Sequence, residues 1–207
     1  ADSDSMPAVA VARTPRTLSS SSSSTTTPAP TTTSTPATTT TRERSDSLFC
    51  FSVMNSDNYE LSLMRSQLSK GAGIFTCDEW SVFSDKRTWL SPGPPVRIDA
   101  TVLDIQVKAA AGSSTHFLNT DVFTRAWEKI HNEGKYKDHD WTVKVDPDAV
   151  FFPSRLKDHV RSLSAHDHSK GMYVLNCHYT DGKYWFFGAL EVISIKAVET
   201  YYAGADR

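Results

Sequence analysis

The chain has 207 residues, with 22 Lys and Arg against 24 Asp and Glu, and its formal net charge is -2. This near balance, without a basic stripe interleaved with aromatic residues, argues against nucleic acid as a partner. No apolar run is long enough to span a bilayer and no signal segment opens the chain. We therefore expect any membrane contact to come from a segment outside this chain.

The first part of the chain is low in complexity, because residues 19–41 are only Ser, Thr, Pro and Ala. Such a segment has too little apolar surface to offset the entropy cost of ordering. The composition is typical of an extended, O-glycosylated stalk, and equally of a disordered linker without chemistry of its own. We expect residues 1–47 to be a disordered Ser/Thr/Pro-rich stalk and residues 48–207 to form the folded domain.

The folded part opens with a strand signal, a helix signal and a second strand signal. Residues 48–54 form an apolar run, residues 61–68 repeat apolar side chains at helical spacing, and residues 73–77 form another short apolar run. This order predicts two parallel strands joined by a helical crossover. Asp78 would then lie at the carboxyl tip of the second strand, where an acid either meets a ribose hydroxyl or is simply solvated.

The remaining segments continue the alternation. A strand is expected within residues 98–105, and residues 172–177 and 184–194 are each expected to form a strand. Helices are expected from about residue 121 to Gly134, from Pro153 onward, and after Ile195. The aromatic cluster at residues 184–187 suits stacking on a sugar or base, and it suits a protein core equally.

The three cysteines, Cys50, Cys77 and Cys177, match no zinc-binding spacing. Cys50 and Cys77 fall in the two successive predicted strands, so they form a disulfide if those strands are neighbours. Buried free thiols are the alternative. The segment His166-Asp167-His168 is either a pair of metal ligands or a solvated polar loop.

Residues 140–153 carry the most informative motif. A β-rich run, residues 141–145, delivers Asp146 and Asp148 to one side of the strand, with Lys144 behind them. Pro147 cannot donate to a sheet ladder, so the strand ends where open α/β sheets bind their ligands.

Two carboxylates in this arrangement suit Mg²⁺ or Mn²⁺, although an isolated Asp-x-Asp is also common in solvated turns. An EF-hand calcium loop is excluded, because Phe151 stands where that loop needs glycine.

The order of these parts resembles the GT-A glycosyltransferases, in particular the β-1,3-galactosyltransferase and fringe-like enzymes. Residues 141–148, followed by Phe-Phe-Pro, are similar to the strand that ends in the family's DxD motif. Residues 188–194 are similar to its glycine-containing acceptor-side segment, and residues 75–78 to the strand tip that approaches the nucleotide. The resemblance implies an α/β, Rossmann-like nucleotide-sugar-binding domain with a mostly parallel central sheet.

The resemblance also implies a reaction: metal-dependent transfer of a hexose from a nucleotide sugar, a UDP-sugar, to a glycan or glycoprotein acceptor. Asp148 would bind Mn²⁺ or Mg²⁺ directly, Asp146 would contact the nucleotide sugar or the waters of the metal, and Asp78 would contact the nucleotide. Lys144 either neutralises Asp146 or is a solvated lysine at the strand edge. The family's usual place is the Golgi or secretory lumen, with a type II membrane anchor.

The chain also departs from the family pattern. Pro147 occupies the middle of the DxD motif, Gly188-Ala189 replaces a pair of glycines, and the chain stops at Arg207. Related enzymes continue into a segment with an acidic catalytic residue and often a histidine metal ligand. No catalytic base is assigned, and Glu191 is a candidate only through its position. The alternative function is an inactive carbohydrate-binding or scaffold module on a mucin-like stalk.

Overall fold

The computed structural model describes residues 46–104, 110–111, 117–118, 120–163, 171–178 and 182–204. These residues belong to one compact unit, Arg44–Arg207. The predicted stalk and the segment His166-Asp167-His168 lie outside the described residues. No helix within the described residues is long and apolar enough to cross a membrane.

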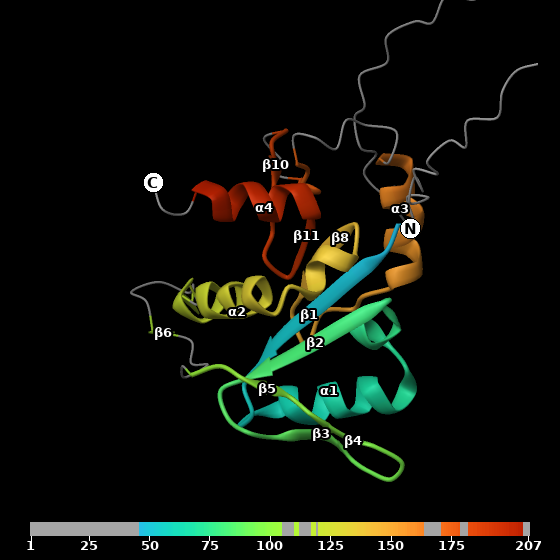
Figure 1. The fold of residues 1–207 in the computed structure, drawn as a ribbon, viewed down its shortest axis with the longest axis vertical. Helices are drawn as coiled ribbons and strands as arrows, with labels where there is room; N and C mark the ends of the chain where they lie inside the picture. Colours follow the sequence, from blue (N-terminus) through green and yellow to red (C-terminus); the bar gives the residue numbers. More distant parts are fainter. Residues whose placement is uncertain are drawn as a thin grey trace, which may run out of the picture. The chain divides into compact units, whose positions relative to one another are not determined.

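A five-stranded sheet in the order β11-β8-β1-β2-β5 forms the centre of the domain (Figure 1). Its strands are β1 (Leu48–Met54), β2 (Glu79–Ser84), β5 (Thr101–Val102), β8 (Trp141–Val145) and β11 (Leu190–Ser194). All neighbouring pairs are parallel except β8 and β11, which are antiparallel. The expected α/β, Rossmann-like fold with a mostly parallel sheet is confirmed.

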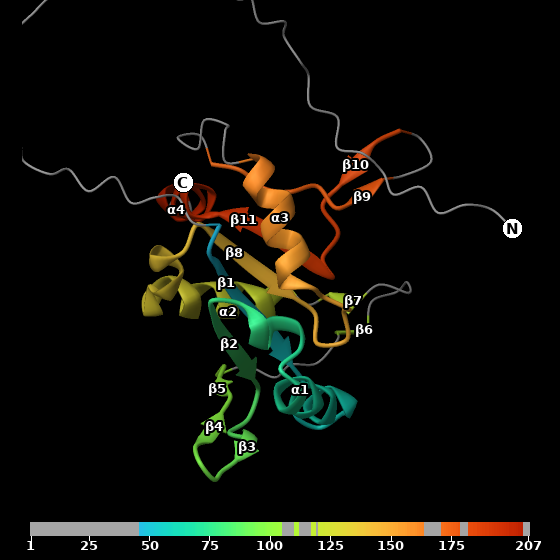
Figure 2. The same ribbon diagram turned by 90° about the vertical axis from the view of Figure 1, so that its right-hand side faces the viewer.

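Helices cover both faces of the sheet, so β1 and β8 are buried along their whole length. Alternate residues of β1 serve the two faces, with Leu48 and Cys50 on one and Phe49 and Phe51 on the other. The first face packs against α1 (Tyr59–Lys70) and α3 (Pro153–Leu163), and the second against α2 (Thr120–Glu133) and α4 (Ile195–Gly204) (Figure 2). Burial on both sides explains why β1 is apolar at every position except Ser52.

The expected helices are present, whereas the other expected strands are shorter, interrupted or absent. The region 98–105 contains β4 (Arg97–Asp99), which pairs with β3 (Trp89–Pro92), and the separate β5. The expected strand at residues 172–177 is wrong, because these residues run beside β11 through one isolated bridge and only Cys177 belongs to a strand, β9 (Cys177–His178). The expected strand at residues 184–194 is interrupted: β10 (Tyr184–Trp185) pairs with β9 and is separate from β11. The remaining short elements are β6 (Ala110–Ala111), β7 (Phe117–Leu118), η1 (Gly73–Thr76) and η2 (Lys135–Asp138).

The expected position of the second strand is wrong. Residues 73–76 form the 3₁₀ helix η1, and the strand that pairs with β1 begins only at Glu79. A short apolar run does not distinguish a strand from a buried turn of helix. Here Gly71 and Gly73 both take positive φ angles, 54° and 60°, which turn the chain after α1 and send Ile74 into the core. Asp78 therefore precedes β2 instead of following it.

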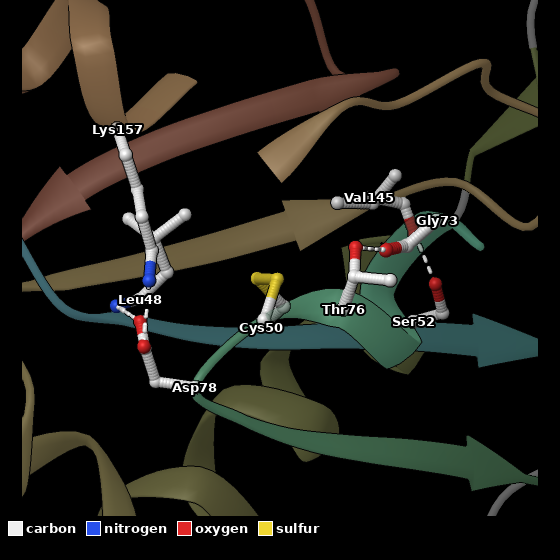
Figure 3. The surroundings of a disulfide bond; sticks show 9 residues. Leu48, Cys50, Ser52, Gly73, Thr76, Asp78, Val145 and Lys157 are labelled. Atoms are coloured by element: carbon white, nitrogen blue, oxygen red, sulfur yellow. Dashed lines mark hydrogen bonds and ion pairs between the residues drawn. A yellow bond between two sulfur atoms is a disulfide. The ribbon is translucent and has the colours of Figure 1, made fainter. Parts of the chain in front are cut away.

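Of the two alternatives for Cys50 and Cys77, the disulfide is the one present (Figure 3). Cys50 lies in the middle of β1 and is fully buried, whereas Cys77 follows η1 and is not part of a strand. Cys177 is free. The bridge fixes the connection between α1 and β2 to the central strand of the sheet.

Candidate functional site

The order of the strands creates a switch point between β1 and β8. From β1 the chain continues to β2 and β5 on one side, and β8 then joins β1 on the other side. In open α/β sheets, ligands bind outside the carboxyl ends of the strands at such a point. Because β1 and β8 are parallel, the residues that follow them, Asn55 and Asp146, lie at the same edge.

A cavity of about 220 Å³ lies at this switch point. It is lined by Val53, Glu60, Val122, Phe123, Asp146, Pro147 and Asp148, which come from the end of β1, from α1, from α2 and from the turn after β8. Three of the residues in this lining are acids and none is basic. The structure thus brings Asp146 and Asp148 together in one cavity.

The two carboxylates are carried by a tight turn. The Asp146 carbonyl accepts the Ala149 N–H at 3.0 Å, and the Asp146 N–H donates to the Ala189 carbonyl at 3.0 Å. From α1, the Gln67 amide donates to the Pro147 carbonyl at 2.7 Å. Asp followed by Pro is a common start for such turns. Asp146 and Asp148 therefore do lie in a turn, as the alternative interpretation of the Asp-x-Asp motif predicted. This turn borders the cavity.

Asp146 is paired with a buried lysine. The Lys144 Nζ lies 2.6 Å from Asp146 Oδ1, and the side chains of Lys144 and Asp146 are 4% and 35% exposed. The ammonium also donates to the Gly188 carbonyl and lies 4.0 Å from Glu191 Oε1. Of the two alternatives for Lys144, the one in which it neutralises Asp146 is confirmed.

Asp148 has a neutral partner instead. Its Oδ2 accepts a hydrogen bond from the Tyr59 hydroxyl at 2.9 Å. This hydrogen bond and the charge of Asp148 raise the pKa of Tyr59 above its ordinary value, so the phenol stays protonated at neutral pH. The two carboxylates of the cavity therefore differ, since one is neutralised by an ammonium and the other is held by a phenol.

Glu191 lies next to this cluster. It is directly opposite Lys144 in the pairing of β11 with β8. Burial raises the pKa of Glu191, and the charge of Asp146 adds to this rise, while Lys144 acts in the opposite direction. Glu191 is thus a half-buried acid beside the carboxylate turn.

Asp78 lies at the opposite edge of the sheet (Figure 3). Its Oδ2 accepts the N–H of Leu48, the first residue of β1, at 2.7 Å, and its Oδ1 pairs with Lys157 Nζ at 2.6 Å. The expected contact with the nucleotide depends on a position at a carboxyl strand tip. The predicted position of Asp78 at a carboxyl strand tip is wrong, because β2 starts after Asp78. The Asp78 side chain instead connects the amino end of β1 to α3.

An acid that the sequence reasoning missed is Asp85, which follows β2 at the carboxyl edge. It accepts hydrogen bonds from the Ser56 hydroxyl at 2.8 Å and the Ser56 N–H at 3.2 Å. Burial alone would raise the pKa of Asp85, but these hydrogen bonds outweigh it and lower the pKa. Placing the second strand at residues 79–84 would have identified Asp85 as the acid at the strand tip.

The side chains around the cavity fit a divalent ion only if other ligands complete its coordination. Among the described residues, no group of three or more His, Cys, Asp or Glu side chains is arranged to hold a metal. Asp146 and Asp148 provide two carboxylates at one cavity. Mg²⁺ is commonly bound by one or two carboxylates, with waters and substrate phosphates completing its shell. The residues fit that mode, and the described part of the chain does not form an all-protein cage.

No protein-family profile matches the chain, and no curated protein matches it in sequence. One similar solved structure is a glycosyltransferase involved in the glycosylation of the major capsid of PBCV-1, with 11% identity and a TM-score of 0.40, over 76% of this chain and 64% of that chain. Another is a cytidylyltransferase from Leptospira borgpetersenii serovar Hardjo-bovis (strain JB197), with 12% identity and a TM-score of 0.37, over 78% of this chain and 65% of that chain.

This chain therefore spans slightly less than two thirds of the length of either structure. At TM-scores this low the similarities carry no argument about function. The fold assignment rests on the strand order and strand directions described above.

Proposed function

We propose that this chain is the donor-binding part of a metal-dependent glycosyltransferase, which moves a hexose from a UDP-sugar to a glycan or glycoprotein acceptor. The observation that carries the proposal is the cavity at the switch point, lined by Asp146 and Asp148. Open α/β sheets bind nucleotides at this place. Asp78 is left out of the proposed site because it lies at the other edge of the sheet.

The charge of the cavity supports a requirement for a cation. Its lining contains Glu60, Asp146 and Asp148 and no basic side chain. A diphosphate without a counter-ion would meet carboxylates there and be repelled. A divalent ion such as Mn²⁺ or Mg²⁺, when bound, supplies Lewis-acid stabilisation of the charge that develops on the leaving diphosphate.

The residues divide the remaining tasks. Asp148, whose partner is a neutral phenol, would hold the ion. Asp146 would use the oxygen outside its ion pair to accept a hydrogen bond from the sugar nucleotide or from a water of the metal. Val53, Val122 and Phe123 form the apolar side of the cavity, against which the donor would lie.

We further propose a location in the Golgi or secretory lumen, with membrane contact only through a segment outside this chain. The disulfide between Cys50 and Cys77 supports this location. Disulfides persist in oxidising compartments and are rare in the cytosol. A reduced form of the chain isolated from its native cell would contradict the proposed location.

Calorimetry of UDP binding, with and without Mn²⁺, tests the proposed function. The matched variants are Asp148→Ala and Asp158→Ala, the second of which removes a 73% exposed carboxylate from α3. We expect Mn²⁺-dependent binding in the unchanged chain and in Asp158→Ala, and its loss in Asp148→Ala. A folded chain that binds no UDP, or binds it equally without Mn²⁺ and without Asp148, refutes the donor site and favours the scaffold alternative.

A further inference from the structure

Lys144 is an unusual residue for the centre of a sheet. It is the second-last residue of β8, and its side chain is 4% exposed between two helical layers. Removing an ammonium from water is costly unless its charge and hydrogen bonds are satisfied. A packed apolar side chain at this position would avoid that cost. The contacts of Lys144 show what its charge does here.

The first contact fixes Asp146. The ammonium holds Asp146 Oδ1 at 2.6 Å, while the backbone N–H of Asp146 is held by the Ala189 carbonyl at 3.0 Å. Both the backbone and the carboxylate of Asp146 are therefore held in place. Its Oδ2 remains outside the ion pair, on a side chain that lines the cavity and is 35% exposed.

The other contacts join Lys144 to the surrounding walls. The ammonium donates to the Gly188 carbonyl, just before β11, and lies 4.0 Å from Glu191 Oε1. It also lies 4.3 Å from the centre of the Phe123 ring, which belongs to α2 and lines the cavity. One buried charge thus connects the turn after β8, the start of β11 and α2.

The charge of Lys144 also separates the two carboxylates. An ammonium beside Asp146 repels a second cation and cancels much of the attraction that this carboxylate offers. Asp148 is paired with the neutral Tyr59 hydroxyl and keeps its full attraction for a cation. A divalent ion in this cavity therefore favours Asp148.

We propose that Lys144 is a positioning residue of the donor site, which orients and neutralises Asp146 so that this carboxylate accepts a hydrogen bond from a hydroxyl of the UDP part of the sugar nucleotide. The divalent ion is held by Asp148. This inference rests on the proposed function, and it adds a residue that acts on the donor through Asp146.

The test compares Lys144→Met with Lys157→Met. Lys157 pairs with Asp78 at the same N–O distance, 2.6 Å, at the other edge of the sheet, so its removal is a matched loss of an ion pair. Two affinities are measured for each variant: that for Mn²⁺ alone, from the electron paramagnetic resonance signal of the free ion, and that for UDP at saturating Mn²⁺, by calorimetry.

For Lys144→Met we expect UDP affinity to fall roughly tenfold or more, the usual effect of losing an orienting charge-assisted hydrogen bond. Affinity for Mn²⁺ alone should rise, because the charge of Asp146 is no longer cancelled. Lys157→Met should change neither affinity. A purely structural role for Lys144 would weaken both affinities together, and that result, or unchanged UDP affinity, overturns the inference.

The double variant Lys144→Met, Asp146→Asn keeps the inference testable if the single variant does not fold. It replaces a buried ion pair with neutral groups of similar size, a change that folded proteins commonly tolerate. We expect its Mn²⁺ affinity to stay close to that of the unchanged chain and its UDP affinity to fall roughly tenfold. Loss of Mn²⁺ binding would make Asp146 a metal ligand and overturn the inference.

The two proposals fail in different ways. If the unchanged chain binds no UDP, the proposed function and the role of Lys144 fall together. If the unchanged chain binds UDP with Mn²⁺ and Lys144→Met binds it equally well, only the role of Lys144 is wrong.

Discussion

Reduction of the disulfide between Cys50 and Cys77 should strongly destabilise the domain. The two cysteines are separated by 27 positions in the sequence, and α1 lies inside the loop that they close. For a loop of this length, the chain-entropy model gives a stabilisation of about 3.5 kcal/mol at 25 °C. Domains of this size are stabilised by roughly 5–15 kcal/mol in total, so the bridge contributes a large share.

Urea unfolding followed by tryptophan fluorescence, with and without a phosphine reductant, measures this contribution. With a denaturant slope of about 2 kcal/mol per molar urea, the loss corresponds to a fall in the midpoint of about 1.8 M. Cys177→Ser is the control, because this variant keeps the bridge and removes the free thiol. It should unfold like the unchanged chain and respond equally to the reductant.

A fall in the midpoint of less than about 0.5 M would refute the reasoning, because it corresponds to only about 1 kcal/mol. The bridge would then not restrict the unfolded chain as the entropy model requires. If the double variant Cys50→Ala, Cys77→Ala responded to the reductant as the unchanged chain does, the effect would not come from this bridge.

Two further predictions concern stability. Although burial acts to raise the pKa of Asp78, hydrogen bonds from Lys157 and a backbone N–H lower it below its ordinary value of 3.8. This stabilisation is therefore present at neutral pH and is lost as the pH falls below that value, so Asp78→Asn should lower the urea midpoint at pH 7 but make little difference near pH 2. Gly171→Ala should cost at least about 2 kcal/mol in urea unfolding, because a Cβ there would lie 2.8 Å from the Ala197 backbone at a φ of 73°. Gly182→Ala, at a φ of 82° with no atom within 4 Å of the added Cβ, should cost only about 1 kcal/mol.

The parts of the fold that follow from local patterns could be predicted from the sequence. Residues 48–54 are apolar at every position except Ser52 because β1 is covered on both faces. Pro147 marks the end of β8 because proline lacks the N–H that a ladder needs. Together these two signals are enough to predict that Asp146 and Asp148 lie at an edge of the sheet.

Features that depend on distant partners could not be predicted. The apolar run after Gly73 forms η1 because of backbone turns and a disulfide to β1, and neither is apparent in its hydrophobic pattern. Lysine is normally solvated, and the burial of Lys144 depends in part on distant partners such as the Gly188 carbonyl, 44 positions later in the chain, and the Phe123 ring of α2. Asp85 could not be recognised as a strand-tip acid while β2 was expected several residues too early.

The reversed direction of β11 determines which loops reach the ligand edge. Because β11 is antiparallel to β8, its first residue, Leu190, pairs with Val145, the last residue of β8. The backbone just before β11 therefore lies beside the turn that carries Asp146. A parallel strand in the same place would have sent residues 188–189 to the far end of the sheet. One strand reversal thus lets two separate stretches of sequence determine the position of the Asp146 carboxylate, so a change in the backbone just before β11 would shift the carboxylate turn as well.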